Sequence, residues 1–367
     1  MSAVVFHYHV AADAGDIDAR AETLLLEQTV ELPRAAATNA WVRQNIIGEV
    51  LSIEPHDDGG FLVAIAQPLR TTALAPAQFL NVAFGNSSLQ PDVKLVEIEP
   101  PAALFETFKG PRFGADALRQ KLGAQNRALT ATALKPMGLP PDGLAALAHD
   151  FAVAGIDIIK DDHGLADHDF CRFEQRVELC QRAVERANAE TGGRSIYAPN
   201  LIGSPSSVVR QFAFAREAGA GAVLLAPMLV GPALLHELAS DAALPIIAHP
   251  AFGGWDWIAP DVLFGAIFKW FGADASIYPH LGGRFSYSRE TCASLARRLT
   301  SSAHGLKPAL PVPAGGIRTN RVREILSFYG SDTMLLVGGS LLETGDVVQR
   351  AKDFVAEVAS VSRELAS

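Results

Sequence analysis

From about residue 126 onward, short apolar runs alternate with longer segments in which apolar positions recur every three or four residues. The short runs predict strands and the longer segments predict helices, because a strand buries alternate residues and a helix buries one stripe. The eight predicted strands are residues 130–134, 155–159, 195–199, 222–226, 244–248, 274–278, 309–313 and 334–337. Helices are predicted at residues 142–154, 173–189, 206–218 and 317–328. Eight such units predict an α/β fold, a (β/α)8 TIM barrel.

The first 110 residues do not share this repeat. Strand-like runs at residues 4–10, 47–54, 61–68 and 93–99 surround helical segments at 12–28 and 72–79. We therefore predict a smaller α+β domain with an antiparallel sheet over residues 1–110 and the barrel over residues 111–367. An open doubly wound sheet is the alternative to the barrel, but no GxGxxG motif follows its first strand.

Composition is typical of a globular protein, since 49% of the 367 residues are hydrophobic and 19% are charged. The net charge of −9, without a run of Lys or Arg, argues against a nucleic-acid partner. Residues 222–235 are apolar but too short and proline-broken to span a membrane, and the N-terminus lacks the signal-peptide pattern. The three cysteines have no metal-site spacing, so we expect a cytoplasmic protein without membrane contact.

The run from Ile156 to His163 ends an apolar strand in a lysine, two aspartates and a histidine. Charged groups gathered at the end of a core strand point to a metal, a cofactor or a charged substrate that compensates them. A solvated turn is the alternative interpretation.

Other polar residues follow neighbouring strands and should share a rim with this cluster, because the strands of a TIM barrel end at one face. They are Lys135 after strand one, Asn200 after strand three, His249 after strand five and His280 after strand six. Taken singly, Asn200 can satisfy a turn and either histidine can be a core residue.

Glycine pairs follow the last two strands, at Gly315-Gly316 and at Gly338-Gly339, the latter before Ser340. In this fold the loops at these positions commonly bind phosphate through backbone N–H groups. Tight turns that need glycine are the alternative. Two pairs at these two positions favour a phosphate site.

These motifs resemble the large subunit of RuBisCO and its non-carboxylating relatives, the RuBisCO-like proteins, over nearly the whole chain. The motifs are Lys135-Pro-Met-Gly-Leu139, Gly155-Ile-Asp-Ile-Ile-Lys-Asp-Asp162, Phe108-Lys-Gly-Pro-Arg112 and the glycine pairs. The resemblance implies a homodimer in which one N-terminal domain covers the partner's barrel mouth. It also implies that Glu27 and Asn81 act in the partner's site, with Asn86 as a rival for the asparagine.

The resemblance further implies that CO₂ carbamylates Lys160, which then holds Mg²⁺ together with Asp162. The third ligand of the family is a glutamate, and His163 occupies its position in this chain. Mg²⁺ prefers oxygen, so an imidazole there favours a softer divalent ion or a site poor in metal.

Three departures from the family pattern argue against ribulose-bisphosphate carboxylation. Met137 stands where the strand-one motif has a second lysine, and Pro250 replaces the arginine that grips a second phosphate. The loop at residues 280–284 lacks the CO₂-binding lysine. One phosphate site therefore remains.

We predict an isomerase or enolase that moves a proton beside the carbonyl of a phosphorylated ketose through an enediolate. The resemblance to RuBisCO-like proteins of methionine salvage implies 5-methylthioribulose 1-phosphate as substrate. Its phosphate would bind at the glycine loops with His280 and Arg284. Beside Lys160, either Lys135 or His249 would act as the base.

Two other functions remain open at this stage. One is a decarboxylase or carboxyl-transferring enzyme acting on a phosphorylated 3-oxo sugar acid, and the other is a non-catalytic sugar-phosphate-binding protein. Phe252, Trp255 and Trp257 offer an apolar wall for a methylthio group, although such aromatics commonly serve in packing.

Overall fold

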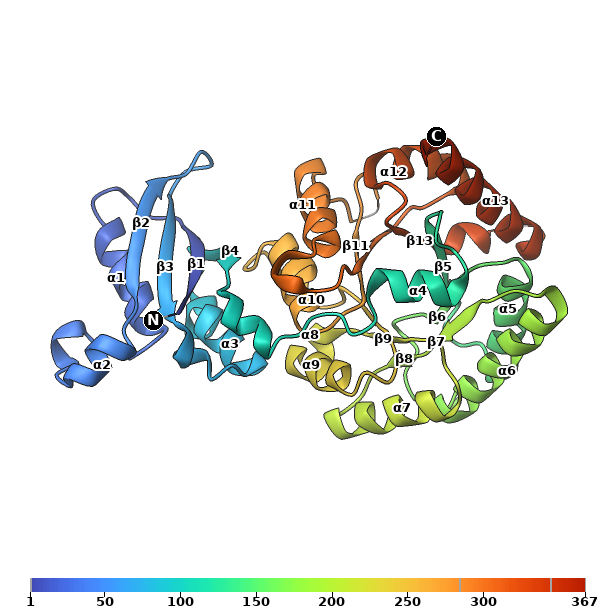
Figure 1. Cartoon of the computed structure of the whole chain (residues 1–367), viewed down its shortest axis with the longest axis horizontal. Coiled ribbons are helices and arrows are strands. Elements are labelled where there is room, and N and C mark those ends of the chain that lie inside the picture. The colour runs from blue at the N-terminus through green and yellow to red at the C-terminus, as the bar shows by residue number, and fades with distance from the viewer. Residues whose placement is uncertain (1, 284, 344, 367) are drawn as a thin grey trace. The chain divides into compact units, whose positions relative to one another are not determined.

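The computed structural model describes residues 2–283, 285–343 and 345–366, which form two compact units (Figure 1). The first unit comprises Met1–Lys109 and Gly254–Leu263, and the second comprises Gly110–Gly253 and Phe264–Ser367. A short segment from the middle of the chain therefore belongs to the first unit.

The first unit contains an antiparallel sheet with the strand order β2-β3-β1-β4. Its elements are β1 (Ala3–Val10), α1 (Ile17–Glu27), α2 (Ala40–Asn45), β2 (Glu49–Pro55), β3 (Phe61–Pro68), α3 (Pro76–Phe84) and β4 (Val93–Glu99). Every second residue of β1 is buried, as expected for a strand that covers a core on one face. Leu95 of β4 bonds through its backbone to Trp257 and Ala259, which fixes the inserted segment to the edge of the sheet.

The second unit contains a parallel sheet that closes on itself. Its strands are β5 (Leu129–Leu134), β6 (Ile158–Asp161), β7 (Ile196–Ala198), β8 (Asn200–Leu201), β9 (Val223–Leu225), β10 (Ile246–Ala248), β11 (Ala275–Pro279), β12 (Leu310–Ala314) and β13 (Met334–Val337). They pair in the order β7-β6-β5-β13-β12-β11-β10-β9-β8. Only Pro199, which has no N–H to donate, separates β7 from β8, so the two ends of this order are one strand. The predicted TIM barrel is confirmed.

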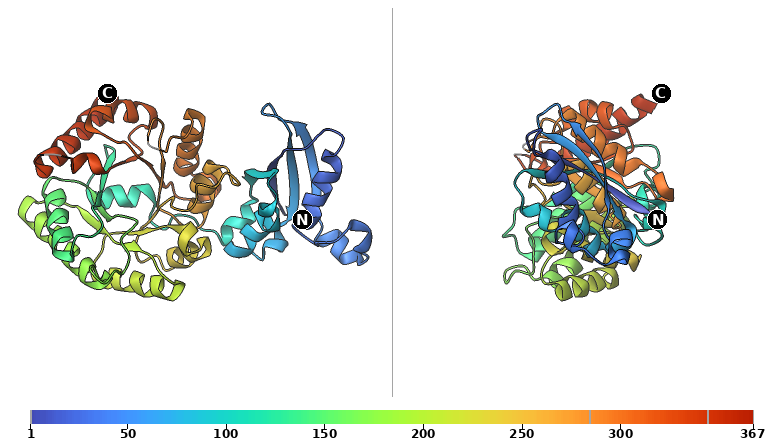
Figure 2. Two further views of the ribbon diagram at one scale, coloured as in Figure 1. Left: turned by 180° about the vertical axis from the view of Figure 1, so that it is seen from behind. Right: turned by 90° about the vertical axis from the view of Figure 1, so that its left-hand side faces the viewer.

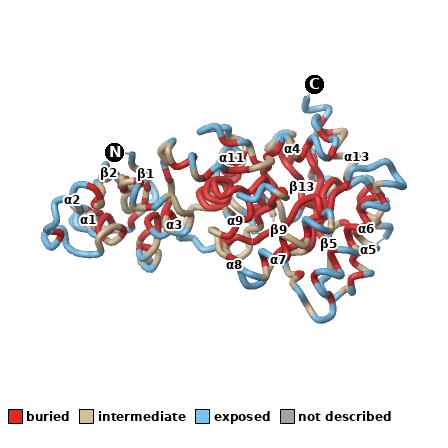
Figure 3. The backbone as a smooth tube through the Cα atoms, turned by 60° about the horizontal axis from the view of Figure 1, so that its bottom comes forward, coloured by how far each residue is buried: buried red, intermediate tan, exposed pale blue. Residues whose placement is uncertain are grey.

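Helices surround these strands, and their buried faces turn toward the barrel (Figures 2 and 3). They are α4 (Gly114–Leu122), α5 (Pro141–Val153), α6 (Phe173–Thr191), α7 (Pro205–Glu217), α8 (Pro227–Val230), α9 (Pro232–Ser240), α10 (Phe268–Trp270), α11 (Arg289–Thr300), α12 (Val322–Tyr329) and α13 (Val347–Ala366). Short 3₁₀ helices lie at Arg34–Ala36, Leu69–Thr72, Asn86–Leu89, Ala102–Glu106, Ala303–Gly305, Thr319–Arg321 and Gly339–Leu341, and a π-helix lies at Asp261–Ile267. Within the described part of the chain, no helix combines the length and apolarity that a membrane crossing needs.

Small and branched side chains fill the barrel interior, and each strand supplies alternate residues to it. The interior residues include Ala131, Ile158, Ala198, Leu224, Ile247, Ile277, Val312 and Leu336. The interior is therefore a packed core, and helix α4, which lies across the barrel in Figure 1, adds Ala115, Leu118 and Leu122 to it.

Several predicted boundaries are wrong: the helix predicted at residues 12–28 begins at Ile17, and the one predicted at 72–79 lies at Pro76–Phe84. Two further differences lie in the barrel, next to the predicted site. Strand β6 begins at Ile158 and not at residue 155, because Gly155, with φ of 85°, ends the preceding helix. Helix α12 begins at Val322 and not at residue 317, because Gly316 adopts φ of 78° and the following residues form a separate turn. The shift of β6 matters for function, because it places Lys160 and Asp161 inside the strand and not after its end.

A buried polar cluster holds the first two strands together at the end of the barrel opposite the predicted site. The carboxylate of Asp157 accepts two hydrogen bonds of 2.7 Å from the Arg127 guanidinium. It also accepts bonds from the backbone N–H and the hydroxyl of Thr130, at 2.8 and 2.9 Å. Removing this carboxylate would leave a mostly buried guanidinium without its counter-charge.

We expect Asp157→Ala to lower the free energy of unfolding by about 3 kcal/mol, because a buried ion pair loses one partner. Urea denaturation measures this loss. Glu364→Ala, which removes an exposed partner of Arg323, is the control and should leave stability unchanged. Equal effects of the two substitutions would contradict the structural role of Asp157.

Candidate functional site

Side chains alternate along β6, and this alternation separates its two charged residues. Ile158 lies in the barrel interior, so Lys160, two residues later, points the same way and is 3% exposed. Asp161 points to the opposite side, toward the surrounding helices. Lys160 is held by a 3.0 Å hydrogen bond from its Nζ to the carbonyl of Asp161.

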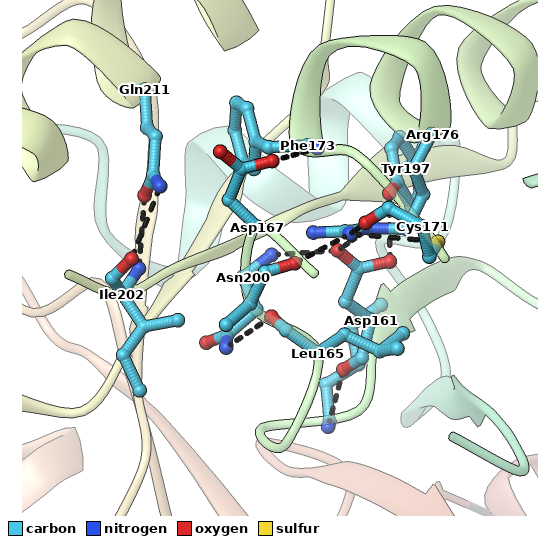
Figure 4. A network of polar contacts seen from close by, with 12 residues as sticks. Asp161, Leu165, Asp167, Cys171, Phe173, Arg176, Tyr197, Asn200, Ile202 and Gln211 are labelled. Carbon is cyan, nitrogen blue, oxygen red and sulfur yellow. Dashed lines mark hydrogen bonds and ion pairs between the residues drawn. The ribbon is translucent and has the colours of Figure 1, made fainter. Parts of the chain in front are cut away.

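Asp161 is a structural residue in a polar network outside the barrel interior (Figure 4). Its Oδ2 accepts hydrogen bonds of 3.0 Å from Arg176 Nε and from the backbone N–H of Asn200. Its Oδ1 accepts a 2.7 Å bond from the Tyr197 hydroxyl. The side chains of Asp161 and Arg176 are both completely buried, so each charge is compensated by the other, and Arg176 also donates to the carbonyls of Ala166 and Cys171.

Asn200, which the sequence placed at the rim, fixes the loop that follows β6. Its side-chain amide donates hydrogen bonds of 3.0 Å to the carbonyls of His163 and Leu165. The interpretation of Asn200 as a residue that satisfies a turn is therefore confirmed. Through this loop it sets the position of His163.

Asp162 is the centre of the charged cluster. Its Oδ1 lies 3.0 Å from Lys135 Nζ and 3.3 Å from His163 Nδ1. Burial raises the pKa of Asp162, but hydrogen bonds from His163 and Lys135 outweigh it and hold the pKa well below its usual range. This carboxylate therefore stays ionised and keeps a positive charge beside it.

The imidazole rings of His163 and His249 stack, with centroids 4.3 Å apart and planes 13° from parallel. The strands that precede them, β6 and β10, are separated in the barrel by the β7–β8 strand and by β9. The loop after β6 therefore reaches across the mouth. The structure brings together Lys135, Lys160, Asp162, His163 and His249.

Two of these groups have pKa values shifted by their surroundings. Burial lowers the pKa of Lys160 to about 8, with Asp162 raising it and Lys135 lowering it further. Burial, followed by the nearby Lys160 charge, lowers the pKa of His249 to about 2. His249 is thus neutral at physiological pH. Lys160 gains and loses its proton at a pH close to the physiological value.

The hydrogen bond of His249 determines which ring nitrogen carries the proton. Its Nδ1 lies 3.1 Å from the backbone N–H of Ala251 and accepts it. A neutral imidazole has one acceptor and one donor, so Nε2 carries the hydrogen. His249 can therefore donate a hydrogen bond through Nε2 but cannot accept a proton there.

The two glycine loops are joined to each other. The Ser340 hydroxyl donates a 3.0 Å bond to the Ile317 carbonyl, and Arg318 forms a two-pronged ion pair with Glu343 at 2.7 and 3.1 Å. These contacts connect the loop after β12 to the loop after β13. The two loops therefore form one continuous surface of the rim, next to β5 and β6.

Glycine occurs at the two pairs for different structural reasons. Gly315 and Gly316 have φ of 92° and 78°, so the turn itself requires glycine there. A Cβ added at Gly338 or Gly339 would meet no atom within 4 Å, and neither residue has positive φ. Positive φ explains the first pair but not the second, where Gly338 is half-buried and Gly339 is exposed.

His280 and Arg284 were predicted to contact the substrate. The structure buries His280 to 2% exposure, and its Nε2 has no hydrogen-bond partner among the described residues. Burial lowers its pKa to about 4, and the nearby Arg321 lowers it further. Its contact with a ligand stays a prediction, and Arg284 lies outside the described residues.

The first unit pairs the predicted glutamate with the rival asparagine. Glu27 Oε1 accepts a 3.0 Å hydrogen bond from Asn86 Nδ2, whereas the Asn81 amide donates a 3.4 Å bond to Gln78. Action of Glu27 and Asn81 in a partner's site stays a prediction, and the geometry favours Asn86 as the residue that accompanies Glu27.

The predicted metal ligands do not fit Mg²⁺ as they stand. Unmodified Lys160 offers an amine and His163 an imidazole, so Asp162 is the single anionic oxygen donor of the set. That carboxylate is also in contact with the Lys135 ammonium. Among the described residues, no cluster of three or more His, Cys, Asp or Glu side chains is arranged to hold a metal. The expected Mg²⁺ thus depends on carbamylation of Lys160 and stays a prediction.

Comparison with known proteins agrees with this fold. Residues 114–249 match the family model for the ribulose bisphosphate carboxylase large chain, catalytic domain. The ribulose bisphosphate carboxylase-like protein 1 of Rhodopseudomonas palustris is 48% identical over 97% of this chain and 98% of its own length. The chain belongs to the RuBisCO large-chain family and, within it, to the RuBisCO-like proteins.

Two further relatives have names that state a reaction. The 5-methylthioribulose-1-phosphate isomerase of Rhodospirillum rubrum is 42% identical over 97% of this chain and 96% of its own length. The 2,3-diketo-5-methylthiopentyl-1-phosphate enolase of Geobacillus kaustophilus is 32% identical over 93% and 88%. Among solved structures, a RuBisCO-like protein from Rhodopseudomonas palustris superposes with a TM-score of 0.92 and 43% identity, covering 98% of each chain.

Sequence reasoning missed Arg176, although its signal was present. Phe173, Val177 and Cys180 form the buried stripe of helix α6, and Arg176 lies among them. An arginine within an apolar stripe needs a buried carboxylate as its partner. Candidates in the sequence were Asp161 and Asp162, at the end of the preceding apolar run.

The lowered pKa of Lys160 predicts a pH-dependent stability difference between the wild type and Lys160→Met. The native pKa of about 8 lies below the ordinary lysine value of 10.5, so the unfolded chain binds more protons between these values. Relative to the variant, wild-type stability should rise with pH across this window by about 1.4 kcal/mol per unit. Urea titrations at pH 7.5, 9 and 10 measure it, and a constant difference would contradict the shift.

Proposed function

We propose that this chain is an enzyme that moves a proton beside the carbonyl of a phosphorylated ketose through an enediolate. The observation that carries the proposal is the stacking of His163 on His249, which closes Lys160, Asp162 and Lys135 into one cluster at the barrel mouth. The cluster combines a lysine of lowered pKa with hydrogen-bond donors, as proton transfer next to a carbonyl needs.

The geometry favours Lys160 as the base. Its buried amine, with a pKa of about 8, is partly neutral near physiological pH, whereas the Lys135 ammonium is paired with Asp162. The sequence analysis predicted either Lys135 or His249 as the base. His249, whose Nδ1 is already an acceptor, suits hydrogen-bond donation from Nε2 to the oxygen that becomes negative.

The reaction then needs one proton to leave and one to return. The Lys160 amine takes a proton from the carbon beside the carbonyl, and the electron pair moves to the carbonyl oxygen. Lys135 and His249 stabilise the enediolate oxygens through a positive charge and a hydrogen bond. The proton then returns to the former carbonyl carbon, and the hydroxyl proton of the neighbouring carbon moves to the former carbonyl oxygen, which completes an isomerisation. The phosphate binds through backbone N–H groups on the glycine loops at Gly316 and Gly339, which are both exposed residues.

We propose 5-methylthioribulose 1-phosphate as the substrate and isomerisation as the reaction. The relative named for this isomerisation is closer to the chain, at 42% identity, than the relative named for the enolase reaction, at 32%. Both named substrates carry a phosphate at carbon 1 and a methylthio group at carbon 5. The proposal therefore assigns the chain to methionine salvage.

In D₂O, the wild type should incorporate deuterium into 5-methylthioribulose 1-phosphate beside its carbonyl, as followed by proton NMR. Lys160→Met should slow this exchange at least about 100-fold, because a general base contributes that much or more. The exchange rate should rise as pH rises through about 8, since the neutral amine is the active form.

Lys269→Met is the matched control. Lys269 is also a buried lysine whose pKa burial lowers to about 8, but it donates to the carbonyls of Arg298 and Ser301 at the end of α11. Its loss should leave deuterium exchange unchanged.

The same experiment separates the alternative functions. Sugar-phosphate binding without any exchange would support a non-catalytic binding protein. Exchange that depends on release of CO₂ from a 3-oxo acid would support the decarboxylase.

Added CO₂ distinguishes the amine from its carbamate. If the free amine of Lys160 is the base, carbamylation removes it and CO₂ should slow exchange. Acceleration by CO₂ would show that the carbamate is the active form and would overturn the assignment of the base.

A further inference from the structure

Phe252 combines a left-handed backbone with an exposed aromatic ring, three residues after His249. Its φ is 64°, which is rare for a bulky side chain, and the side chain is 63% exposed. Such strained residues cluster at ligand-binding sites, where the surrounding structure holds them in place.

The turn around Phe252 is held from both sides. The backbone N–H of Gly253 donates to the Pro250 carbonyl at 2.9 Å, and the N–H of Ala251 donates to His249 Nδ1. A Cβ on Gly253 would lie 2.6 Å from the ring of Phe264, so the turn packs directly on the core. Glycine would suit the left-handed position itself, yet the chain has its phenylalanine there and its glycine one residue later.

Phe252 lies on the apolar part of the rim. The segment after β9, the strand paired with β10, is the apolar helix α8 (Pro227–Val230), and Leu229 in it is 45% exposed. Around the barrel, β9 is four strands from β13, with β12, β11 and β10 between them. In an eight-stranded barrel this places the segment after β9 opposite the second glycine loop, whereas Phe252 follows β10, one strand nearer, at three strands from β13.

A ketose phosphate bound through its phosphate at the glycine loops would extend its other end toward this apolar rim. The two tryptophans that the sequence grouped with Phe252 belong to the first unit, where Trp255 and Trp257 stack on each other at 5.1 Å. Of these three aromatic residues, Phe252 is therefore the one that belongs to the barrel unit.

We propose that Phe252 determines substrate specificity by binding a thioether or alkyl group at the end of the substrate opposite the phosphate. This inference rests on the proposed function and deepens it. A methylthio group packs favourably on an aromatic ring, whereas a hydroxyl at the same place would lose water without gaining a hydrogen bond.

The test compares two ligands that differ only at carbon 5. Dissociation constants of 5-methylthioribulose 1-phosphate and ribulose 1-phosphate are measured by calorimetry on the wild type, Phe252→Gly and Phe252→Asn. Both replacements tolerate the left-handed backbone, so the variants should fold and melt no lower than the wild type. Each should weaken the methylthio ligand about tenfold and change ribulose 1-phosphate less than twofold.

Phe170→Gly is the control, because Phe170 is another exposed aromatic on a rim loop, stacked on His168. It should leave the ratio of the two constants unchanged. Equal weakening of both ligands by Phe252→Gly, or an unchanged ratio, would overturn the role of Phe252 while leaving the proposed function intact. If the wild type bound neither ligand, the proposed function and this inference would both fail.

Discussion

The alternation of side chains along β6 is the constraint on which the site depends. Because successive residues of a strand face opposite sides, Lys160 points into the barrel mouth and Asp161 points to the helices. Asp161 finds Arg176 there, in a completely buried ion pair. The barrel end of the strand therefore presents a lysine without a carboxylate from the same strand to neutralise it.

This separation determines the electrostatics of the mouth. Lys160 is buried and competes with a second cation, Lys135, for the single carboxylate of Asp162, so its pKa falls to about 8. His249 stacks on His163 beside Lys160, and burial keeps His249 neutral. A neutral amine and a neutral hydrogen-bond donor can thus exist together near physiological pH, which proton transfer beside a carbonyl requires.

Much of this arrangement could be predicted from the sequence. Eight apolar runs gave the barrel, and the rule that parallel strands end at one face placed Lys135, Lys160 and His249 together before any contact was known. The contacts that decide roles could not be predicted, because they join loops whose conformation no periodicity specifies. The stack of His163 on His249 is one such contact. The bond from Ala251 to His249, which fixes the tautomer, is another.

The central claim is that the lysine cluster after β6 and the glycine loops after β12 and β13 serve one ligand. A crystal structure of the chain with a non-reacting ketose-phosphate analogue tests it most directly. The account predicts the phosphate on the amides of Gly316 and Gly339, with the carbonyl within hydrogen-bond distance of Lys160 Nζ or His249 Nε2. An analogue whose phosphate occupies those loops while its carbonyl points out to solvent, or one bound elsewhere, would contradict the account.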